Sequence, residues 1–484
     1  MAILKDAFKD LNVRHADASR TNNLKVIAGL VDEYENLLNQ APEELSILFG
    51  LGTCKLQLGM NGSAIMYFQQ AIQSNNKLPE LWNNLGSAWK AENRNDEARQ
   101  CFEKALSLKD DPDYYNNLAT LHVNEGRPDE GIEYAEKGIA LNPEHPRLRW
   151  NYSLLLLEKG RWKEGFENYD YGLLSLDRPN RFYSDKPEDV PIWNGEKGRV
   201  VVYGEQGMGD EIMFASAIPD LIADIGRENV IFDCHERMVS LFERSFGVTC
   251  YGTRKNEDIS WPLKDKPDYR IAIGSLFGRY RKDGKFPKTR YLKADPELVK
   301  HYREKLEATG PGPYVGLGWQ AGYKKTRQDL RSFKLKQFLP VLEQGGTFVS
   351  LQYTEGSEDK VARFKEDTGF TIHHWTDVVQ SKDPEGNEYT GFDYDHTVAL
   401  IEALDICILP NTSSVHVCGA IGADCWTLTP KAAAWRYQLK GNFMPMYGSW
   451  VRQIREREDW KDAFKRAARD YGWYLADKQK AVGG

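Results

Sequence analysis

Small and bulky residues alternate at a fixed spacing through the first third of the chain. The small residues Ala64, Ala98, Gly131 and Gly165 stand 34, 33 and 34 positions apart. Bulkier residues mostly follow four positions later, at Phe68, Phe102, Ala135 and Tyr169, and a second small residue follows three further on, at Ala71, Ala105, Gly138 and Gly172. Residues four apart share one face of a helix. The pattern therefore predicts paired helices that pack closely where the small residues lie.

A period near 34 with this alternation is typical of the tetratricopeptide repeat, two antiparallel helices per unit. Residues 79–106 match the pattern best, and the stretch 24–39 reads as half of an earlier unit or a cap. We predict four repeats plus a cap over residues 1–173, stacked into an α-helical superhelix with a concave face. Asparagines recur on the first helix of successive units, at Asn83, Asn84, Asn116, Asn117 and Asn151. They form either a ladder for an extended peptide or ordinary polar positions.

The pattern changes after residue 173. Residues 174–195 are rich in proline and charge and carry no period, which predicts a connector. Short β-branched runs then alternate with helical stretches, and this alternation restarts near Pro311. It predicts two Rossmann-like α/β domains, 196–308 on the acceptor side and 309–442 on the nucleotide-sugar side, with a ligand cleft between them. We expect the helical segment 443–484 to pack back on the first α/β domain.

A glycine-rich turn follows the β-branched run that ends at Tyr203. Its members are Gly204, Gln206, Gly207, Met208 and Gly209, and an apolar helix starts directly after Asp210. Open α/β sheets bind ligands at the carboxyl ends of their strands, so a carboxylate placed there can take a proton from an incoming hydroxyl. Ile212 stands where the dinucleotide fingerprint needs its third glycine. The alternative is a tight turn in which Asp210 only caps the helix.

Composition narrows the classes of protein. A length of 484 residues predicts about two to four domains, and a net charge of −7 does not suggest a nucleic-acid binder. The seven cysteines are scattered without metal-ligand spacing and lie mostly in apolar contexts. The start of the chain carries charges where a signal peptide would be apolar, and no apolar run approaches a membrane span. We expect a reduced, cytoplasmic protein.

Several motifs together resemble a known family. They are GEQGMGDEIMFAS, FDCHERMVSLFE, IAIGSLFGRY, VGLGWQAG, FVSLQY and DHTVALIEALDICILPNTSSVHVCGAIG. In order and spacing they resemble the bacterial glycosyltransferases that carry tetratricopeptide repeats and are related to the ADP-heptose:lipopolysaccharide heptosyltransferases. The resemblance runs from the repeats through Trp460. It implies the GT-B architecture, two facing Rossmann-like domains, and an inverting, metal-independent transfer from a nucleotide-activated sugar.

The resemblance also implies roles for individual residues. Asp210 matches the proposed general base. The segment matching the one that holds the donor's diphosphate contains Asn411, Thr412, Ser413, Ser414 and His416. A helix that begins here offers free N–H groups and a favourable dipole to an anion. The family usually has aspartate where this chain has Asn411, a departure that bears on donor identity and activity. A plain N-cap is the alternative for this stretch.

A second phosphate-binding candidate follows the strand in VGLGW. Gln320, Lys324 and Arg331 lie there, together with Lys325 and Arg327. Cations at this place would offset the charge that develops on a departing nucleotide diphosphate. For any single lysine a solvated position is the better interpretation. Arg331 matches a family position and is the preferred candidate.

Two further motifs are weaker. Asp393-Tyr394-Asp395 has the D-x-D form of metal-dependent glycosyltransferases, but it directly precedes an apolar helix, so capping explains it better. Adjacent histidines at a strand end, as in His373-His374-Trp375, point to opposite faces, which disfavours a shared metal, although one of them can touch a nucleobase. We therefore expect no metal and no cofactor beyond the nucleotide-sugar co-substrate.

The leading prediction is a glycosyltransferase in which Asp210 deprotonates the acceptor hydroxyl. One alternative is a non-catalytic, repeat-based interaction protein with a vestigial nucleotide-sugar-binding module, which Asn411 favours. Another is a different nucleotide-dependent enzyme such as a dehydrogenase, which the missing third glycine disfavours. The acceptor stays open between a protein, a glycan and another hydroxyl-bearing molecule, recruited by the repeats, through which the chain can also oligomerise.

Overall fold

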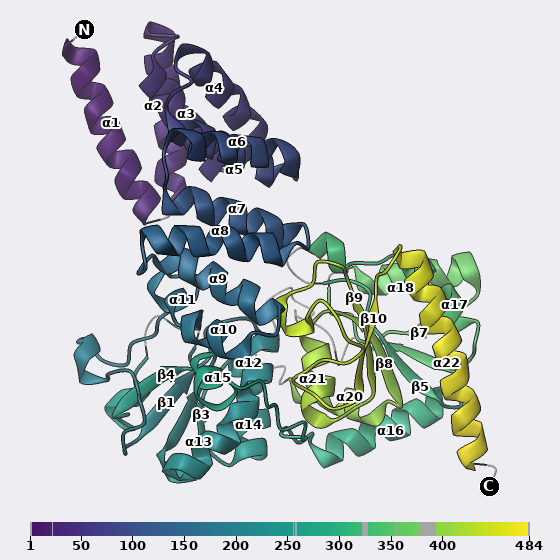
Figure 1. Cartoon of the computed structure of the whole chain (residues 1–484). Coiled ribbons are helices and arrows are strands. Elements are labelled where there is room, and N and C mark those ends of the chain that lie inside the picture. Colours follow the sequence, from purple (N-terminus) through teal and green to yellow (C-terminus); the bar gives the residue numbers. More distant parts are fainter. Residues whose placement is uncertain are drawn as a thin grey trace. The chain divides into compact units, whose positions relative to one another are not determined.

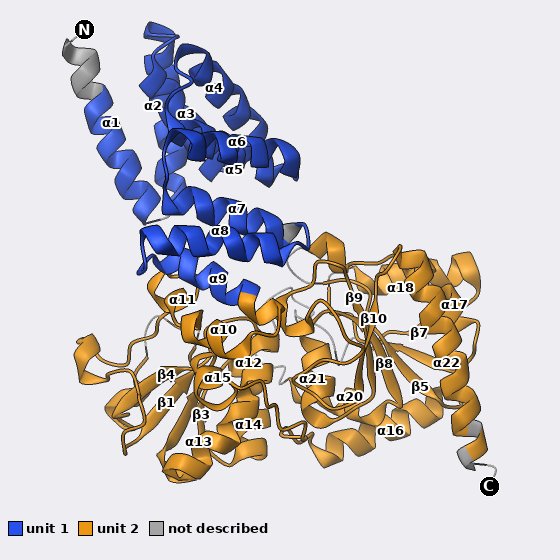
Figure 2. Cartoon of the chain, viewed as in Figure 1, with its two compact units in different colours: residues 1–155 blue, residues 156–484 orange. Residues whose placement is uncertain are grey.

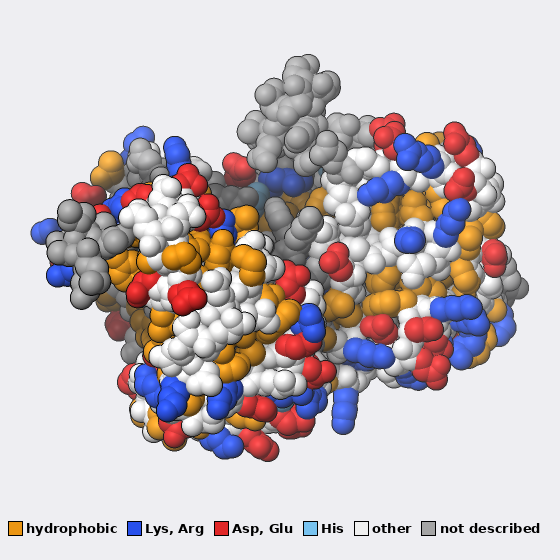
Figure 3. Space-filling view, turned by 90° about the horizontal axis from the view of Figure 1, so that it is seen from above, with side chains coloured by type: hydrophobic (Ala, Val, Ile, Leu, Met, Phe, Trp, Pro, Cys, Tyr) orange, Lys and Arg blue, Asp and Glu red, His pale blue; other side chains and the backbone are white. Residues whose placement is uncertain are grey.

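The computed structural model describes residues 2–21, 23–254, 256, 259–321, 328–354, 356–375, 378 and 394–482. The chain has two compact units, Met1–Leu155 and Leu156–Gly484 (Figure 2). The first is helical and the second contains two parallel sheets. On the face shown in Figure 3, acidic and basic side chains are interspersed, with apolar side chains between them.

The first unit is a stack of helices that pack in consecutive pairs (Figure 1). They are α1 (Ala2–Arg20), α2 (Leu24–Gln40), α3 (Leu45–Gln57), α4 (Asn61–Ser74), α5 (Pro79–Ala91), α6 (Asn95–Leu108), α7 (Pro112–Asn124), α8 (Pro128–Leu141) and α9 (Pro146–Glu158), which crosses into the second unit. Small residues lie where rings from the paired helix press closest. A Cβ on Gly86 would stand 2.7 Å from the Phe102 ring, which explains the alternation in the sequence.

The recurrent asparagines bind one another along the stack. Asn117 Nδ2 donates to Asn83 Oδ1 at 2.7 Å, and Asn151 Nδ2 donates to Asn116 Oδ1 at 2.8 Å. These bonds join the first helices of successive repeats. In each pair one asparagine donates and the other accepts, so these side chains bond to a neighbouring helix of the array. This favours the interpretation of the asparagines as ordinary polar positions that face a neighbouring helix.

The second unit opens with α10 (Trp162–Tyr169) and α11 (Tyr171–Leu174). Phe166 packs on Phe277 with ring centroids 5.8 Å apart, and Tyr169 packs on Phe214 at 6.1 Å. Both partners belong to helices that flank the first sheet. The end of the region predicted as repeats therefore packs with the first α/β layer, and the first compact unit ends at residue 155, within that region.

The first sheet has four parallel strands in the order β3-β2-β1-β4. They are β1 (Val200–Tyr203), β2 (Val230–Asp233), β3 (Thr249–Tyr251) and β4 (Tyr269–Ala272), flanked by α12 (Met208–Phe214), α13 (Ile218–Ile225), α14 (Val239–Phe246) and α15 (Ser275–Tyr280). The apolar helix expected after Asp210 is divided by a 3-10 turn, Ala215–Ala217. Pro219 follows this turn and lacks the N–H that a continuous helix would need.

The second sheet has six parallel strands in the order β10-β9-β8-β5-β6-β7. They are β5 (Tyr314–Leu317), β6 (Thr347–Ser350), β7 (Ile372–His373), β8 (Ile406–Pro410), β9 (Cys425–Thr429) and β10 (Val451–Arg455). Its helices are α16 (Pro296–Thr309), α17 (Leu339–Leu342), α18 (Ser357–Thr368), α20 (Asp395–Ala403), α21 (Ser413–Ile421) and α22 (Trp460–Val482). The parallel α/β arrangement expected from the sequence is present in both sheets.

The expectation that residues 443–484 pack on the first α/β domain is wrong. The apolar face of α22 lies in the core of the second sheet, where the Phe464 and Phe338 rings are 4.8 Å apart and Tyr471 is fully buried. Tyr474 also donates a hydrogen bond to the Asp405 carbonyl at 3.1 Å. The reason is local: β10 joins the second sheet as an edge strand, so the helix that follows it reaches this sheet first (Figure 1).

No helix in the described part of the chain is both long and apolar enough to cross a membrane.

Candidate functional site

The glycine turn lies at the carboxyl end of β1, where the strand order of the first sheet reverses between β1 and β4. Such switch points are where open α/β sheets bind ligands. Gly204 is required by space, since a Cβ there would stand 2.4 Å from Glu211 Oε2. Glu211 is fully buried and accepts hydrogen bonds from Arg254 Nη1 at 2.6 Å and from the His235 amide at 2.9 Å. Burial raises its pKa to about 7 against these two bonds.

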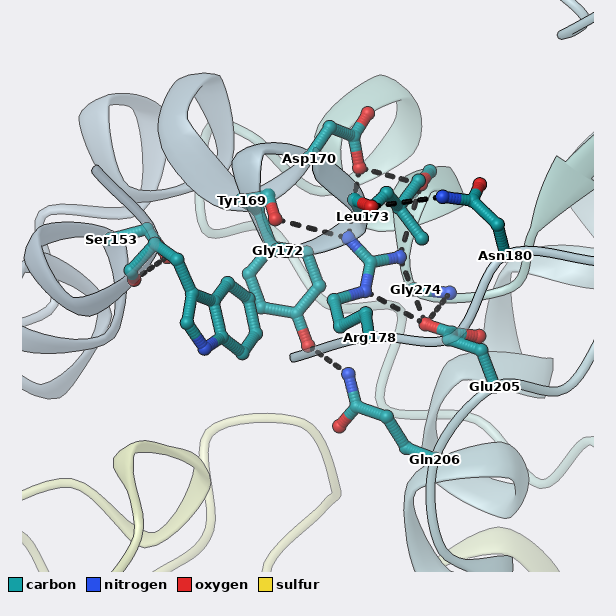
Figure 4. A network of polar contacts seen from close by, with 12 residues as sticks. Ser153, Tyr169, Asp170, Gly172, Leu173, Arg178, Asn180, Glu205, Gln206 and Gly274 are labelled. Carbon is teal, nitrogen blue, oxygen red and sulfur yellow. Dashed lines mark hydrogen bonds and ion pairs between the residues drawn. The ribbon is translucent and has the colours of Figure 1, made fainter. Parts of the chain in front are cut away.

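A buried polar network holds the glycine turn in place (Figure 4). Arg178 is fully buried and donates to Glu205 Oε1 from Nε at 3.1 Å and from Nη2 at 2.9 Å. Its Nη1 donates to Asp170 Oδ1 at 2.9 Å. Gln206 Nε2 donates to the Tyr169 hydroxyl at 2.8 Å. The predicted connector, although rich in charge, therefore packs as part of the support for this turn.

Asp210 lies on the first turn of α12, and its side chain is 19% exposed. Its Oδ1 accepts a hydrogen bond from Arg436 Nη2. Arg436 belongs to a short 3-10 helix, Trp435–Tyr437, that follows β9 of the second sheet. Its Nε is buried and has no hydrogen-bond partner in the described structure. The ion pair thus joins segments of the two sheets, and sequence reasoning did not find Arg436 because no motif surrounds it.

The start of α21 lies directly against the glycine turn. A Cβ on Gly209 would stand 3.1 Å from Ser413 Cα and 3.0 Å from His416 Cδ2, so α12 and α21 touch where glycine leaves room. Thr412 is the N-cap residue of α21, and its side chain makes no capping hydrogen bond. The first N–H groups of this helix are therefore not satisfied by the cap side chain, which is the condition for binding an anion.

Asn411 and Arg331 shape the backbone before α21. Asn411 is buried beneath it, with Oδ1 accepting a hydrogen bond from Thr427 Oγ1 at 2.7 Å and Nδ2 buried without a partner in the described structure. Arg331 Nη1 donates to the Asn411 carbonyl at 2.6 Å, and burial lowers the pKa of this guanidinium. Arg331 therefore carries its charge next to the helix start, while the Asn411 side chain anchors the turn on β9.

The remaining polar groups at the start of α21 are neutral. Ser413 Oγ lies 3.1 Å from the Tyr394 hydroxyl, and Ser414 is buried. His416 is buried with Nδ1 2.8 Å from the Tyr447 hydroxyl, and burial lowers its pKa to about 3. An imidazole with this pKa is uncharged near neutral pH. Arg331 brings a positive charge next to the start of α21.

The other predicted residues are placed less directly. Gln320 lies after β5, across the second switch point from β8, and its Oε1 accepts from Lys360 Nζ at 3.0 Å. Lys324, like Lys325 and Arg327, lies outside the described residues. His374 Nδ1 is 3.0 Å from Ser350 Oγ, and burial lowers the pKa of this imidazole.

The second carboxylate of the D-x-D motif, Asp395, is held in an ion pair. Asp395 accepts hydrogen bonds from both terminal nitrogens of Arg244, one at 2.9 Å, and Arg244 belongs to α14 beside the first sheet. Asp393 lies outside the described residues. Among the residues that the structure describes, no group of three or more His, Cys, Asp or Glu side chains is arranged to hold a metal.

Comparison with known proteins confirms the repeats. Models of the tetratricopeptide repeat match residues 45–78, 79–111 and 116–173. Protein FlbA of Caulobacter vibrioides is 30% identical to this chain over 434 residues, which cover 84% of the chain and 69% of that protein. The chain belongs to the FlbA family.

Solved structures resemble only part of this chain. A crystal structure of MamA is 23% identical and covers 33% of this chain and 94% of its own, with a TM-score of 0.29. A structure of PilF from Pseudomonas aeruginosa is 15% identical and covers 46% of this chain and 86% of its own, with a TM-score of 0.33. Neither likeness carries a functional argument.

Proposed function

We propose that this chain is a glycosyltransferase of the GT-B architecture that transfers a sugar from a nucleotide-sugar to an acceptor hydroxyl. The observation that carries the proposal is the contact at Gly209, which brings α12, with Asp210 on its first turn, against the uncapped start of α21. Each of these segments follows a strand at the switch point of its own parallel sheet. Ligands of such sheets bind at these points.

The donor's diphosphate is proposed to bind at the start of α21. The helix has nine residues, and its first N–H groups and its dipole favour an anion. Arg331 already lies next to this turn. Arg436 pairs with Asp210, and in the proposal it turns to the diphosphate when the donor binds, which frees the carboxylate. Positive charge against the leaving group therefore comes from two arginines.

Asp210 is then the general base of an inverting displacement. The acceptor oxygen forms a bond to the anomeric carbon while the bond from that carbon to the diphosphate oxygen breaks. The hydroxyl proton passes to the Asp210 carboxylate, and the nucleotide diphosphate leaves with the electron pair. Base assistance of this kind contributes about 10²–10⁴-fold to the rate. The repeats are proposed to recruit the acceptor. The scattered buried cysteines fit a protein of a reducing, cytoplasmic compartment.

The test is a thermal-shift screen of the purified chain with UDP-, ADP-, GDP- and CMP-sugars, followed by an assay of donor hydrolysis and transfer. A donor that binds the folded state raises the melting temperature in proportion to the logarithm of its concentration over Kd. We expect the sugars of one nucleotide to raise the melting temperature. They should do so in excess chelator as well. A screen in which no nucleotide-sugar binds would overturn the proposal, and binding that requires a divalent cation would overturn its metal-independent form.

The second candidate is a non-catalytic interaction protein with a vestigial nucleotide-sugar module. It is favoured by the pairing of Asp210 with Arg436, which occupies the carboxylate that the reaction needs. The same assay separates the two functions. A donor that stabilises the chain but is neither hydrolysed nor transferred, with any acceptor extract tried, would favour the second.

A further inference from the structure

A small cavity between β10 and the first half of α22 is lined mainly by arginines. Its volume is about 100 Å³, and its charged lining consists of Arg452, Arg455, Arg457, Arg466, Arg469 and Asp470. The arginines come from an edge strand, the turn after it and successive turns of the helix that covers it. None of these residues belongs to the site proposed for the donor.

The carboxylates near the cavity balance only part of this charge. Asp470 is buried and pairs with both Arg452 and Arg469, the latter at 2.8 Å. Arg466 Nε pairs with Asp462 at 2.8 Å. Five guanidinium groups therefore share two carboxylates, which leaves a net charge of +3 on these groups around one cavity.

Two of the arginines lack a carboxylate altogether. Arg455 donates from Nε to the Gly441 carbonyl at 2.8 Å and from Nη1 to the Gln438 carbonyl at 2.9 Å, and burial lowers its pKa to about 10. The guanidinium of Arg457 is exposed and makes no hydrogen bond or ion pair with any described residue. An anion in the cavity would offset the cost of holding these charges together.

We propose that this cavity binds a phosphate group. Arginine presents a planar fork of N–H donors that matches two oxygens of a phosphate, and several arginines around one cavity suit a tetrahedral anion. A water molecule takes about 30 Å³ of liquid volume, so a cavity of about 100 Å³ has room for a group several times larger, such as a phosphate. Sites for drug-sized ligands start at roughly 300 Å³. The ligand is therefore inorganic phosphate or the phosphate end of a larger molecule that stays outside.

The experiment is a calorimetric titration of the full chain with inorganic phosphate and, separately, with phosphoserine, at constant ionic strength and against chloride. We expect saturable binding of phosphate. Arg457→Gln removes a charge without breaking any described bond, and we expect it to weaken binding about tenfold. Arg469→Gln should do the same. The matched control is Arg279→Gln, at a partly exposed arginine that pairs with Asp224 at 3.9 Å, outside the cavity.

Each outcome decides the proposal. Tighter binding of phosphoserine than of phosphate assigns the site to a ligand-borne phosphate, and the reverse assigns it to the free ion. Absence of saturable binding for both would overturn the proposal, and so would equal affinity in the wild type, Arg457→Gln and Arg469→Gln. Loss of phosphate binding in Arg331→Gln but not in Arg457→Gln would move the anion to the start of α21, which separates this test from that of the proposed function.

Discussion

The starts of α12 and α21 touch at Gly209 but differ in the polar side chains around them. The turn before α12 is held by charges: Arg178 binds Glu205, Arg254 binds Glu211 and Arg436 binds Asp210. The start of α21 is lined by hydroxyls and a neutral histidine, with Arg331 on its backbone. Both follow buried parallel strands at switch points. Their difference lies in the side chains, not in the fold.

Under the proposed function, the two helix starts have different roles. Side-chain charges fixed by partners place a carboxylate accurately, which suits a group that exchanges a proton. A helix start with an uncapped backbone and neutral surroundings leaves its N–H groups for an external anion. Four substitutions test this contrast.

The largest expected effect is on transfer in Asp210→Asn. Asparagine keeps a hydrogen-bond acceptor for Arg436 but cannot accept the acceptor's proton. We expect the transfer rate to fall about 10²–10⁴-fold while donor affinity and melting temperature change little. The control is Asp224→Asn, at a half-exposed carboxylate that accepts from the Tyr280 hydroxyl at 2.7 Å. Near wild-type turnover in Asp210→Asn would make this residue structural and place the base elsewhere.

The charged support of the first turn is tested by Arg178→Met. The change leaves Glu205 buried without its counter-ion, and breaking a buried pair in this way costs about 3–5 kcal/mol. Denaturant unfolding of the full chain should show this loss. Arg161→Met removes an arginine from the exposed pair with Glu164, so it should cost only about 0–1 kcal/mol. Similar losses in the two variants would show that the network in Figure 4 does not support the turn.

The contact between the two helix starts is tested by a pair of glycines. Alanine at Gly209 places a Cβ 3.0 Å from His416 Cδ2 and 3.1 Å from Ser413 Cα, and overpacking of this kind costs about 1–3 kcal/mol. Alanine at Gly207 meets nothing closer than Asp210 Oδ2 at 3.5 Å. We expect Gly209→Ala alone to lower the melting temperature and donor affinity. Equal values for the two variants would mean that α12 and α21 are not held in this contact.

Sequence reasoning succeeded where the signal is local. The 34-residue period predicted the repeats, and the ends of β1 and β8 predicted the two turns, because each pattern is contained in a short stretch. It could not predict that Arg436 meets Asp210, which lies 226 positions earlier, since such a pair depends on how distant segments pack. The segment 174–195 is predicted as a connector because it is rich in charge and proline and carries no period. Arg178 is fully buried there because Glu205 and Asp170 receive its guanidinium.

The prediction of the sheet on which α22 packs failed for the same reason. Its apolar face is visible in the sequence, but either sheet could have covered it. The choice is made by β10, whose hydrogen bonds to β9 bring the following helix to the second sheet.

The last change tests the neutrality of the second helix start. The pKa of His416 falls from 6.5 to about 3 because the ring is buried, so the unfolded chain takes up a proton below pH 6.5 while the folded chain does not. The free energy of unfolding should therefore decrease as pH falls from 6.5 toward 3, by at most about 1.4 kcal/mol per pH unit from this group. His416→Asn keeps an acceptor for the Tyr447 hydroxyl and cannot titrate, so its unfolding free energy should depend less steeply on pH over this range. If His416→Asn keeps the wild-type slope, the imidazole protonates as it would in water. It would then be a cation at the start of α21 in weak acid, and the contrast between a charged first turn and a neutral second one would no longer hold.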